Sequence, residues 1–235
     1  MYNRAVNSRM IIYTPHLFRN VYTGTRADHK RALCDEDMKK VFTKLSSSSA
    51  VPTTVRRAQE LFILMFLLRG LPFVDLAYLR KSDLRDNVIT YRRRKTGRPL
   101  SVTLTPEAMI LLKRYMSRDT DSPYLFPLLK SGEGTKEAYH EYQLALRSFN
   151  QQLMLLGKML GLNDRLSSYA VRHTWATMAY YCEIHPGVIS EAMGHSSITV
   201  TETYLKPFKN KKIDEANVTV ISSLRKTFLS SKFLN

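Results

Sequence analysis

The chain has 235 residues, which is enough for one large domain with a small appendage. Hydrophobic residues make up 44% of it, so we expect a packed core and exclude wholesale disorder. The 36 lysines and arginines exceed the 20 acids and give a formal net charge of +16, which indicates a polyanionic partner. Nucleic acid is the favoured partner, with an anionic membrane surface and the ribosome as alternatives.

Neither the cysteines nor the hydropathy pattern indicates an extracellular or membrane protein. Cys34 and Cys182 are far apart and belong to no CxxC pair or His/Cys cluster, which argues against a disulfide scaffold or a structural zinc site. The longest apolar run, residues 61–68, is too short to span a bilayer, and the N-terminus lacks the apolar core of a signal peptide. We therefore expect a cytoplasmic protein with no membrane partner.

The first predicted elements are a short helix over residues 1–12 and an extended linker over residues 13–33. A second helix is expected to start near Cys34, because three acids follow it and acids favour the positive end of a helix dipole. The serine run at residues 46–49 is predicted to be a loop.

A strong helix is predicted over residues 53–70, and Thr53 or Thr54 can cap it. Its apolar residues repeat at helical spacing and should face the core: Ala58, Leu61, Phe62, Met65 and Leu68. The glycine at its end and Pro72 interrupt this pattern, and a shorter helix or turn carries Asp75.

Residues 88–91 and 99–104 are predicted β-strands, and Gly97 suits the turn between them. Thr105 then caps a helix that has proline at its first position and an acid in its first turn. After a loop, a long helix is expected over about residues 136–160. Its predicted inward residues are Tyr139, Leu146, Phe149, Leu153 and Leu156.

The C-terminal third is predicted to be helical. Ser167 or Ser168 caps a helix that carries an Arg-His pair near its start, and a compact helix over residues 186–193 is closed by a glycine. A further helix carries Tyr204, and a terminal helix spans about residues 213–228. The predicted fold class is therefore mainly α with a small antiparallel β-hairpin or sheet insert, an α+β arrangement.

The most informative residues lie in this C-terminal third. Arg172 and His173 are placed near a helix start, where the dipole favours an anion, and His195 and Tyr204 follow them. A tyrosine hydroxyl has an ordinary pKa of about 10 and is a poor nucleophile, but cations and proton carriers around a phosphate make it useful. Taken singly, these residues have structural alternatives: a surface Arg-His pair, a helix C-cap histidine and a core aromatic.

Three short segments together resemble the signature of tyrosine recombinases of the phage-integrase type: Arg172-His173-Thr174, Met193-Gly194-His195-Ser196-Ser197 and Thr201-Glu202-Thr203-Tyr204. The resemblance covers roughly residues 34–235, which implies that family's catalytic-domain fold with a C-terminal tail helix. Residues 1–33 then resemble the last helix of the preceding core-binding domain plus a linker. Residues 68–70 and 78–84 are similar to the branch common in Bacteroides-type bacteria and their mobile elements.

The resemblance implies roles for five residues. Tyr204 would attack the scissile DNA phosphate and form a 3′-phosphotyrosyl link with a free 5′-hydroxyl, with no metal, ATP or other cofactor. Arg172 and His195 would hold the non-bridging oxygens, whose charge grows in the transition state. Lys95, in a Lys-Thr-Gly turn, would protonate the leaving 5′-oxygen, and His173 would support the site.

The sequence departs from the family pattern at two positions. The family's first catalytic arginine follows a Gly-Leu pair, but here Pro72 occupies that position. Arg69, about one helical turn earlier, and Arg80 are the candidates to replace it. Tyr169 stands where the family usually has His or Lys, and it can still donate a hydrogen bond to a phosphate oxygen.

The partners implied by the resemblance are double-stranded DNA and other recombinase protomers, as a tetramer on DNA and a monomer in solution. The expected DNA contacts are Arg80, Arg92, Arg93, Arg94, Arg98 and Tyr169. Asp75 matches an acidic position that orients the arginines of the site. The terminal helix either packs on its own domain or docks onto a neighbouring protomer through its apolar residues: Ile213, Val220, Ile221, Leu224 and Phe228.

The favoured function is a site-specific DNA recombinase or integrase, because Lys95, Arg172, His195 and Tyr204 are all in place. The alternative is a catalytically impaired DNA-binding relative that acts as a regulator or accessory module. Pro72 and the near absence of a first domain favour that alternative. A basic RNA-binding or ribosome-associated protein would account for the charge but not for the three segments.

Overall fold

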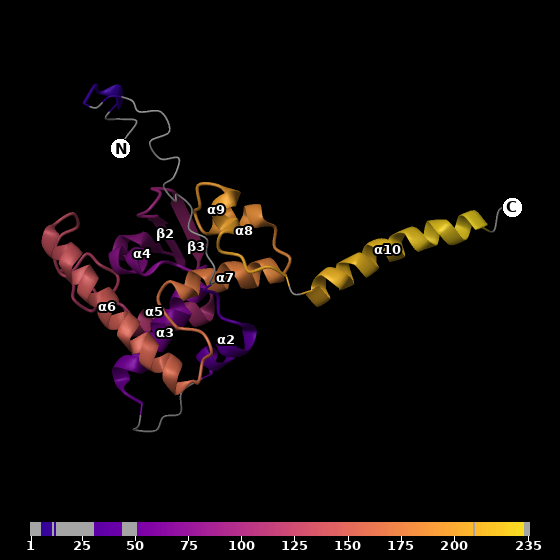
Figure 1. The fold of residues 1–235 in the computed structure, drawn as a ribbon. Helices are drawn as coiled ribbons and strands as arrows, with labels where there is room; N and C mark the ends of the chain where they lie inside the picture. Colours follow the sequence, from indigo (N-terminus) through magenta and orange to yellow (C-terminus); the bar gives the residue numbers. More distant parts are fainter. Residues whose placement is uncertain (1–5, 11, 13–30, 44–50, 209, 233–235) are drawn as a thin grey trace.

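Helices form most of the structure, and one small antiparallel sheet lies beside them (Figure 1). In chain order the elements are α2 (Asp35–Phe42), α3 (Thr53–Leu67), α4 (Phe73–Tyr78), the 3₁₀ turn η1 (Lys81–Asp83), β1 (Leu84–Arg85), β2 (Val88–Arg92), β3 (Pro99–Thr103), α5 (Pro106–Tyr115), α6 (Lys136–Met159), α7 (Ala170–Tyr181), α8 (Pro186–Ala192), α9 (Ile198–Glu202) and α10 (Asn210–Lys232). The predicted fold class, mainly α with a small antiparallel sheet, is confirmed.

The computed structural model describes residues 6–10, 12, 31–43, 51–208 and 210–232. Half of the predicted helix over residues 1–12 therefore lies outside the described residues, as do most of the predicted linker and the serine loop at residues 46–49. Among the helices of the described segments, none is long and apolar enough to cross a membrane.

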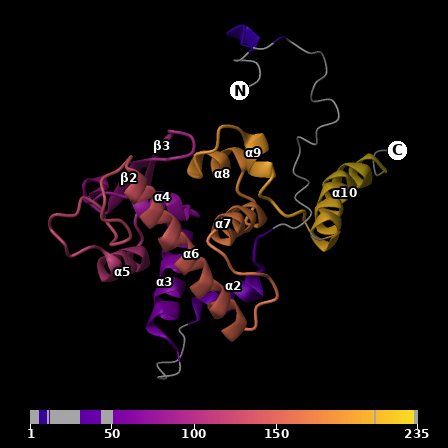
Figure 2. The same ribbon diagram turned by 60° about the vertical axis from the view of Figure 1, so that its left-hand side comes forward.

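The core is built around α3, which contacts α5, α6 and α7 (Figure 2). The predicted inward residues of α3 are all buried, because residues three and four apart share one face of a helix. The predicted cap of α3 was wrong: Pro52 is the N-cap residue and no side chain caps the helix. A proline suits this position because the first amides of a helix have no intrahelical partner.

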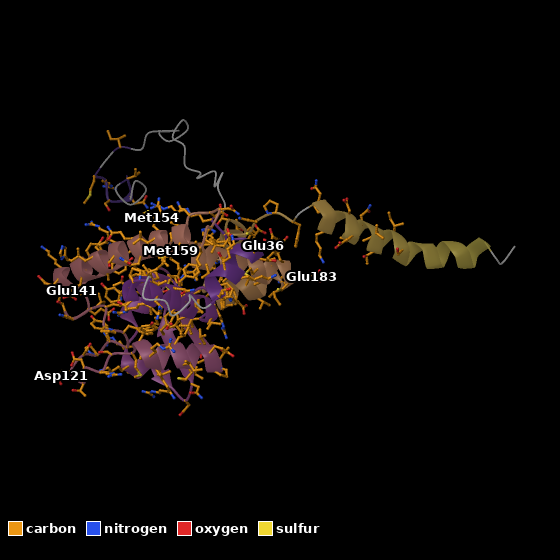
Figure 3. The ribbon with its side chains drawn as sticks, turned by 90° about the horizontal axis from the view of Figure 1, so that it is seen from below. Glu36, Asp121, Glu141, Met154, Met159 and Glu183 are labelled. Carbon is orange, nitrogen blue, oxygen red and sulfur yellow. The ribbon has the colours of Figure 1, made fainter. Side chains whose placement is uncertain are left out.

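The inward face predicted for α6 is confirmed over most of its length but not at its start. Phe149, Leu153 and Leu156 are buried, whereas Tyr139 is 60% exposed. Tyr142, one turn later, packs against the core instead, with its ring centroid 6.3 Å from that of Tyr139. Away from this inward face, α6 exposes the two methionines labelled in Figure 3, Met154 and Met159.

The sheet has the order β1-β2-β3, with both pairs antiparallel. The predicted hairpin is confirmed, and in its register Ile89 lies opposite Val102, so two buried β-branched side chains pack on the core face. The third strand, β1, was not predicted, because two residues are too few to show the alternation that marks a strand. Gly97 has a φ of +69°, which the turn between β2 and β3 requires.

Two predictions about the C-terminal helices were wrong in detail. The N-cap residue of α7 is Tyr169, without a side-chain cap, and the Ser168 amide before it donates to Asn150 Oδ1 of α6 at 2.8 Å. Tyr204 lies two residues beyond the end of α9 rather than within a helix. The closing glycine of α8 is as expected, since Gly194 has a φ of +63°.

The two ends of the described chain behave differently. Ala32 and Leu33, the last residues of the predicted linker, are buried, and the Leu33 amide donates to Thr174 Oγ1 at 3.0 Å. In contrast, α10 projects away from the other helices (Figures 1 and 3), and Ile213, Val220 and Ile221 are exposed. Packing of these three side chains on their own domain is therefore contradicted. Leu224 and Phe228 have no described side chains.

Candidate active site

Segments far apart in the sequence meet at one pocket of about 320 Å³. They are the start of α4, the turn after β2, the middle of α6, the start of α7 and the segment after α9. Its lining includes Pro72, Asp75, Arg93, Lys95, Tyr169, Arg172 and Tyr204. The structure thus brings Lys95, Arg172 and Tyr204 together, and His195 lies directly behind the Tyr204 ring.

Tyr204 is held between two histidines. Its ring centroid lies 4.4 Å from that of His173 and 4.9 Å from that of His195. Its hydroxyl is 3.0 Å from the Tyr169 hydroxyl, and burial together with that hydrogen bond raises the pKa of Tyr169 to about 12. Tyr204 is only 5% exposed, so stacking fixes its ring while its oxygen reaches the pocket.

Arg172 is anchored by backbone carbonyls. Its two terminal nitrogens donate to the carbonyls of Gly70 and Met193, and its buried Nε has no partner. Burial and then the nearby Arg93 charge lower the pKa of Arg172 to about 10. Since that pKa stays well above 7, the pocket contains a buried cation with one unused donor.

Gly70 allows this arrangement because α7 crosses it closely. Its φ is +67°, and a Cβ built there would lie 3.0 Å from Arg172 Cα and 3.2 Å from Trp175 Cβ. No larger residue fits without moving α7. The glycine therefore places both the backbone of Arg172 and the carbonyl that its guanidinium uses.

His195 is fully buried, and its Nδ1 lies 2.8 Å from Thr201 Oγ1. Burial, followed by the positive charges of Arg172 and Arg93, lowers the pKa of His195 to about 3. The imidazole is therefore neutral at pH 7, and its buried Nε2 has no partner. Thr201 was not predicted as a site residue; it lies three residues before Tyr204, and its carbonyl accepts the Tyr204 amide at 2.9 Å.

Lys95 projects from the β2–β3 turn at the mouth of the pocket and is exposed. Side chains on both sides of Lys95 fix the turn to the loop between α8 and α9. Thr96 Oγ1 donates to the Gly194 carbonyl at 3.2 Å, and Arg98 donates to the His195 carbonyl at 2.5 Å. The cation at the turn is thereby tied to the segment that carries His195.

Other predicted residues lie away from the pocket. Arg69 donates to the Ser101 carbonyl of β3 at 3.2 Å, and neither it nor Arg80 lines the pocket. Arg80 and Arg94 both form ion pairs with Glu133, and the Arg94 guanidinium stacks 3.7 Å from the centre of the Tyr78 ring. Neither candidate for the missing first arginine therefore reaches the phosphate pocket.

Arg93 was predicted only as a DNA-backbone contact, but the structure buries it in the site. It is 4% exposed, and it donates to the Gly194 carbonyl at 2.6 Å. A signal for this was available: Ile89 and Tyr91 of β2 and Arg93 directly after it are spaced two residues apart, and all three are buried. Period-two alternation therefore distinguishes Arg93 from its exposed neighbours.

Comparisons with known proteins indicate the family of the chain. The phage integrase family matches residues 31–211. The tyrosine recombinase XerA of Pyrococcus furiosus is 26% identical over 179 residues, which cover 75% of this chain and 57% of that protein. XerA of Saccharolobus solfataricus is 26% identical over 151 residues, which cover 63% of this chain and 46% of that protein. The chain thus spans about half the length of these relatives.

Solved structures show the same fold. The Tn1549 transposon integrase in complex with transposon right end DNA aligns with a TM-score of 0.62 at 15% identity, over 94% of this chain and 75% of that one. A lambda integrase dimer bound to a COC′ core site gives a TM-score of 0.55 at 18% identity, over 86% and 68%. With the family match spanning most of its length, the chain belongs to the phage integrase family.

Proposed function

We propose that this protein is a site-specific DNA recombinase that cleaves and rejoins DNA strands through Tyr204. The observation that carries the proposal is the meeting of Tyr204, Arg172 and Lys95 at one pocket, with neutral His195 behind the nucleophile. The match to the phage integrase family supports it, as does the description of its relatives as tyrosine recombinases.

In the proposed reaction, Tyr204 Oη attacks the scissile phosphorus, and the bond from phosphorus to the 5′-oxygen breaks. The Tyr204 proton passes toward solvent through the Tyr169 hydroxyl 3.0 Å away, and Lys95 donates a proton to the leaving 5′-oxygen. The phosphotyrosyl ester keeps the energy of the broken bond. A second 5′-hydroxyl can therefore displace Tyr204 and rejoin the DNA.

Arg172 and His195 are assigned to the charge that develops on the non-bridging oxygens. Both have a buried nitrogen without a partner, Nε and Nε2 respectively, so each has a donor to offer if Thr201 supplies the hydrogen to His195 Nδ1. The His173 ring lies tilted against that of the nucleophile, with centroids 4.4 Å apart, and supports its position. This division of roles matches the one that the sequence implies.

The basic surface around the pocket is the proposed DNA-binding face. Arg92 and Arg98 lie on either side of Lys95 in the chain, and Tyr169 is partly exposed at the rim. The Tn1549 and lambda integrases were solved in complex with DNA, the latter as a dimer, which supports DNA and further protomers as partners here. A tetramer on DNA and a monomer in solution complete the proposal.

The domain division also remains part of the proposal. Residues 34–235 would be the catalytic domain with its tail helix, and residues 1–33 the end of a core-binding domain plus a linker. The Bacteroides-type branch rests on residues 68–70 and 78–84 alone, because the relatives compared above are archaeal XerA proteins.

The tail helix α10 is proposed to contact a neighbouring protomer. It projects from the domain, exposes Ile213, Val220 and Ile221, and is tied at its start by an ion pair of 2.6 Å between Lys212 and Glu183 (Figure 3). Truncation after residue 210 should abolish assembly of several protomers on DNA but leave the fold intact. Unchanged assembly and cleavage would contradict this role.

The reaction is tested with nicked suicide duplexes whose sequence around the nick is randomised. After incubation, denaturing electrophoresis should separate a covalent protein–DNA adduct, which the Tyr204→Phe variant does not form. The Arg114→Gln variant, altered at an arginine paired with Glu60 outside the pocket, is the matched control and should form the adduct. DNA binding without any adduct would instead support the accessory-module alternative.

A further inference from the structure

The pocket has a gap where the family pattern requires a cation. Pro72 lines the pocket at that position, and a proline side chain cannot bind a phosphate. Arg69 and Arg80 are engaged by Ser101 and Glu133 outside it. The sequence-based candidates therefore leave the gap unfilled, and another residue must supply the charge.

Arg93 is the second guanidinium of the pocket. It lies directly after β2 and lines the same pocket as Arg172, Lys95 and Tyr204. Its Nη1 donates to the Gly194 carbonyl at 2.6 Å, while its buried Nε has no partner. One end of the group is thus anchored, and one donor is left for a ligand.

Two contacts of the fold position the Arg93 side chain. Asp75 Oδ1 accepts the Arg94 amide at 3.0 Å, which fixes the backbone next to Arg93. Gly194 leaves room on the other side, because a Cβ there would lie 3.2 Å from Arg93 Cδ. An arginine that only contacts a DNA backbone at the surface would need neither the Asp75 hydrogen bond nor the space at Gly194.

The charges of the pocket do not balance. Arg93 and Arg172 are both at least 95% buried, and Asp75 is the buried carboxylate among the pocket lining. Burial raises the pKa of Asp75, although both arginines oppose that shift. Burying an unpaired charge is costly, so an excess of buried positive charge indicates a site that is completed by an anion.

We propose that Arg93 replaces the arginine missing at position 72 and binds a non-bridging oxygen of the scissile phosphate opposite Arg172. This inference rests on the proposed cleavage reaction, and it makes Arg93 a catalytic residue rather than a general DNA contact. Asp75 is then the positioning residue for Arg93, acting through the Arg94 amide.

The test uses Arg93→Gln and Arg93→Lys, with Arg114→Gln as the control that also removes one positive charge. At saturating nicked duplex, single-turnover formation of the Tyr204 adduct should fall about 100- to 1,000-fold in Arg93→Gln, since loss of one transition-state donor costs that much. The Lys variant keeps the buried charge, so it tests the same point if the Gln variant does not fold. It should be at least about tenfold slower, because an ammonium cannot reproduce the fork of a guanidinium.

A duplex with a methylphosphonate at the scissile position separates catalysis from structure. The methyl group removes the negative charge of one non-bridging oxygen, which is the charge that the Arg93 guanidinium would neutralise. On this duplex the rate of adduct formation by the Arg93 variants should therefore come within about tenfold of the wild-type rate. A second check is Pro72→Arg in the Arg93→Gln background, which should recover part of the lost rate. Cleavage by both Arg93 variants within twofold of wild type would overturn the inference, as would a deficit that persists on the methylphosphonate.

Inorganic phosphate distinguishes this inference from the proposed function. Phosphate should raise the unfolding temperature of wild type and Arg114→Gln by more than that of Arg93→Lys, because it binds the pocket of the folded state and an ammonium cannot reproduce the fork of a guanidinium. If wild type forms no adduct but shows this Arg93-dependent shift, the cleavage function fails and the anion site stands. If phosphate stabilises wild type and Arg93→Lys equally, the role of Arg93 fails whatever the adduct assay shows.

Discussion

The neutral state of His195 makes a quantitative prediction about stability. The imidazole is fully buried beside two guanidinium groups, and its pKa in the folded protein is about 3. In the unfolded chain the pKa of a histidine is about 6.5. Between these values the unfolded state binds more protons than the folded state, so the free energy of unfolding falls as the pH falls.

The size of the effect follows from the two pKa values. Between pH 7.5 and pH 5.0, His195 alone should lower the free energy of unfolding by about 2 kcal/mol, because the histidine becomes protonated in the unfolded chain but stays neutral in the folded protein. His195→Gln removes this contribution. The drop in that variant should therefore be about 2 kcal/mol smaller than in wild type.

Urea unfolding of both proteins at the two pH values measures the difference. Other titrating groups, including Asp75 with its raised pKa, are common to both proteins and cancel in the comparison. An equal drop in wild type and His195→Gln would refute the reasoning that burial and the arginine charges keep His195 neutral. Saturation with inorganic phosphate should reduce the difference, because an anion near the pocket favours the protonated imidazole.

Three further substitutions test other parts of the structure. Gly70→Ala strains a positive φ and presses a Cβ against Arg172, so urea unfolding should show a loss of about 2 kcal/mol or more; an unchanged midpoint would contradict it. Tyr169→Phe removes the hydroxyl partner of Tyr204, so adduct formation should slow while stability falls by only about 1 kcal/mol, and an unchanged adduct rate would exclude a role for that hydroxyl. Glu133→Gln breaks the ion pairs of two exposed arginines, Arg80 and Arg94, and should change the free energy of unfolding by less than about 1 kcal/mol. Fluorescence anisotropy at low salt should then show tighter DNA binding, and an unchanged affinity would contradict a role of these arginines in binding DNA.

Much of the fold could be predicted because its signals are local. The cap of α5 is an example: Thr105 Oγ1 accepts the Ala108 amide, as the Thr-Pro-Glu sequence indicates. The start of α7 could not be predicted in the same way. Two serines offered caps, but Asn150 of α6 holds the Ser168 amide, and a contact between distant segments leaves no mark in the local sequence.

The candidate site could likewise be predicted only in part. The residue types of Arg172, His195 and Tyr204 indicated the chemistry, and the structure brings them together. The sequence indicated Arg69 or Arg80 in place of the arginine missing at Pro72, but the arginine that lines the pocket beside Arg172 is Arg93, directly after β2. The position of the Arg93 side chain depends on its hydrogen bond to the Gly194 carbonyl in the α8–α9 loop, and only the tertiary fold brings these two segments together.

The central claim is that Tyr204 becomes covalently joined to DNA, and mass spectrometry of the trapped adduct tests it most directly. Trypsin cleaves after Arg172, so Tyr204 and its hydroxyl neighbour Tyr169 fall on different peptides. We expect a nucleotide mass on the peptide that carries Tyr204. A nucleotide on the Tyr169 peptide, or no modified peptide from protein that binds the nicked duplex, would contradict it.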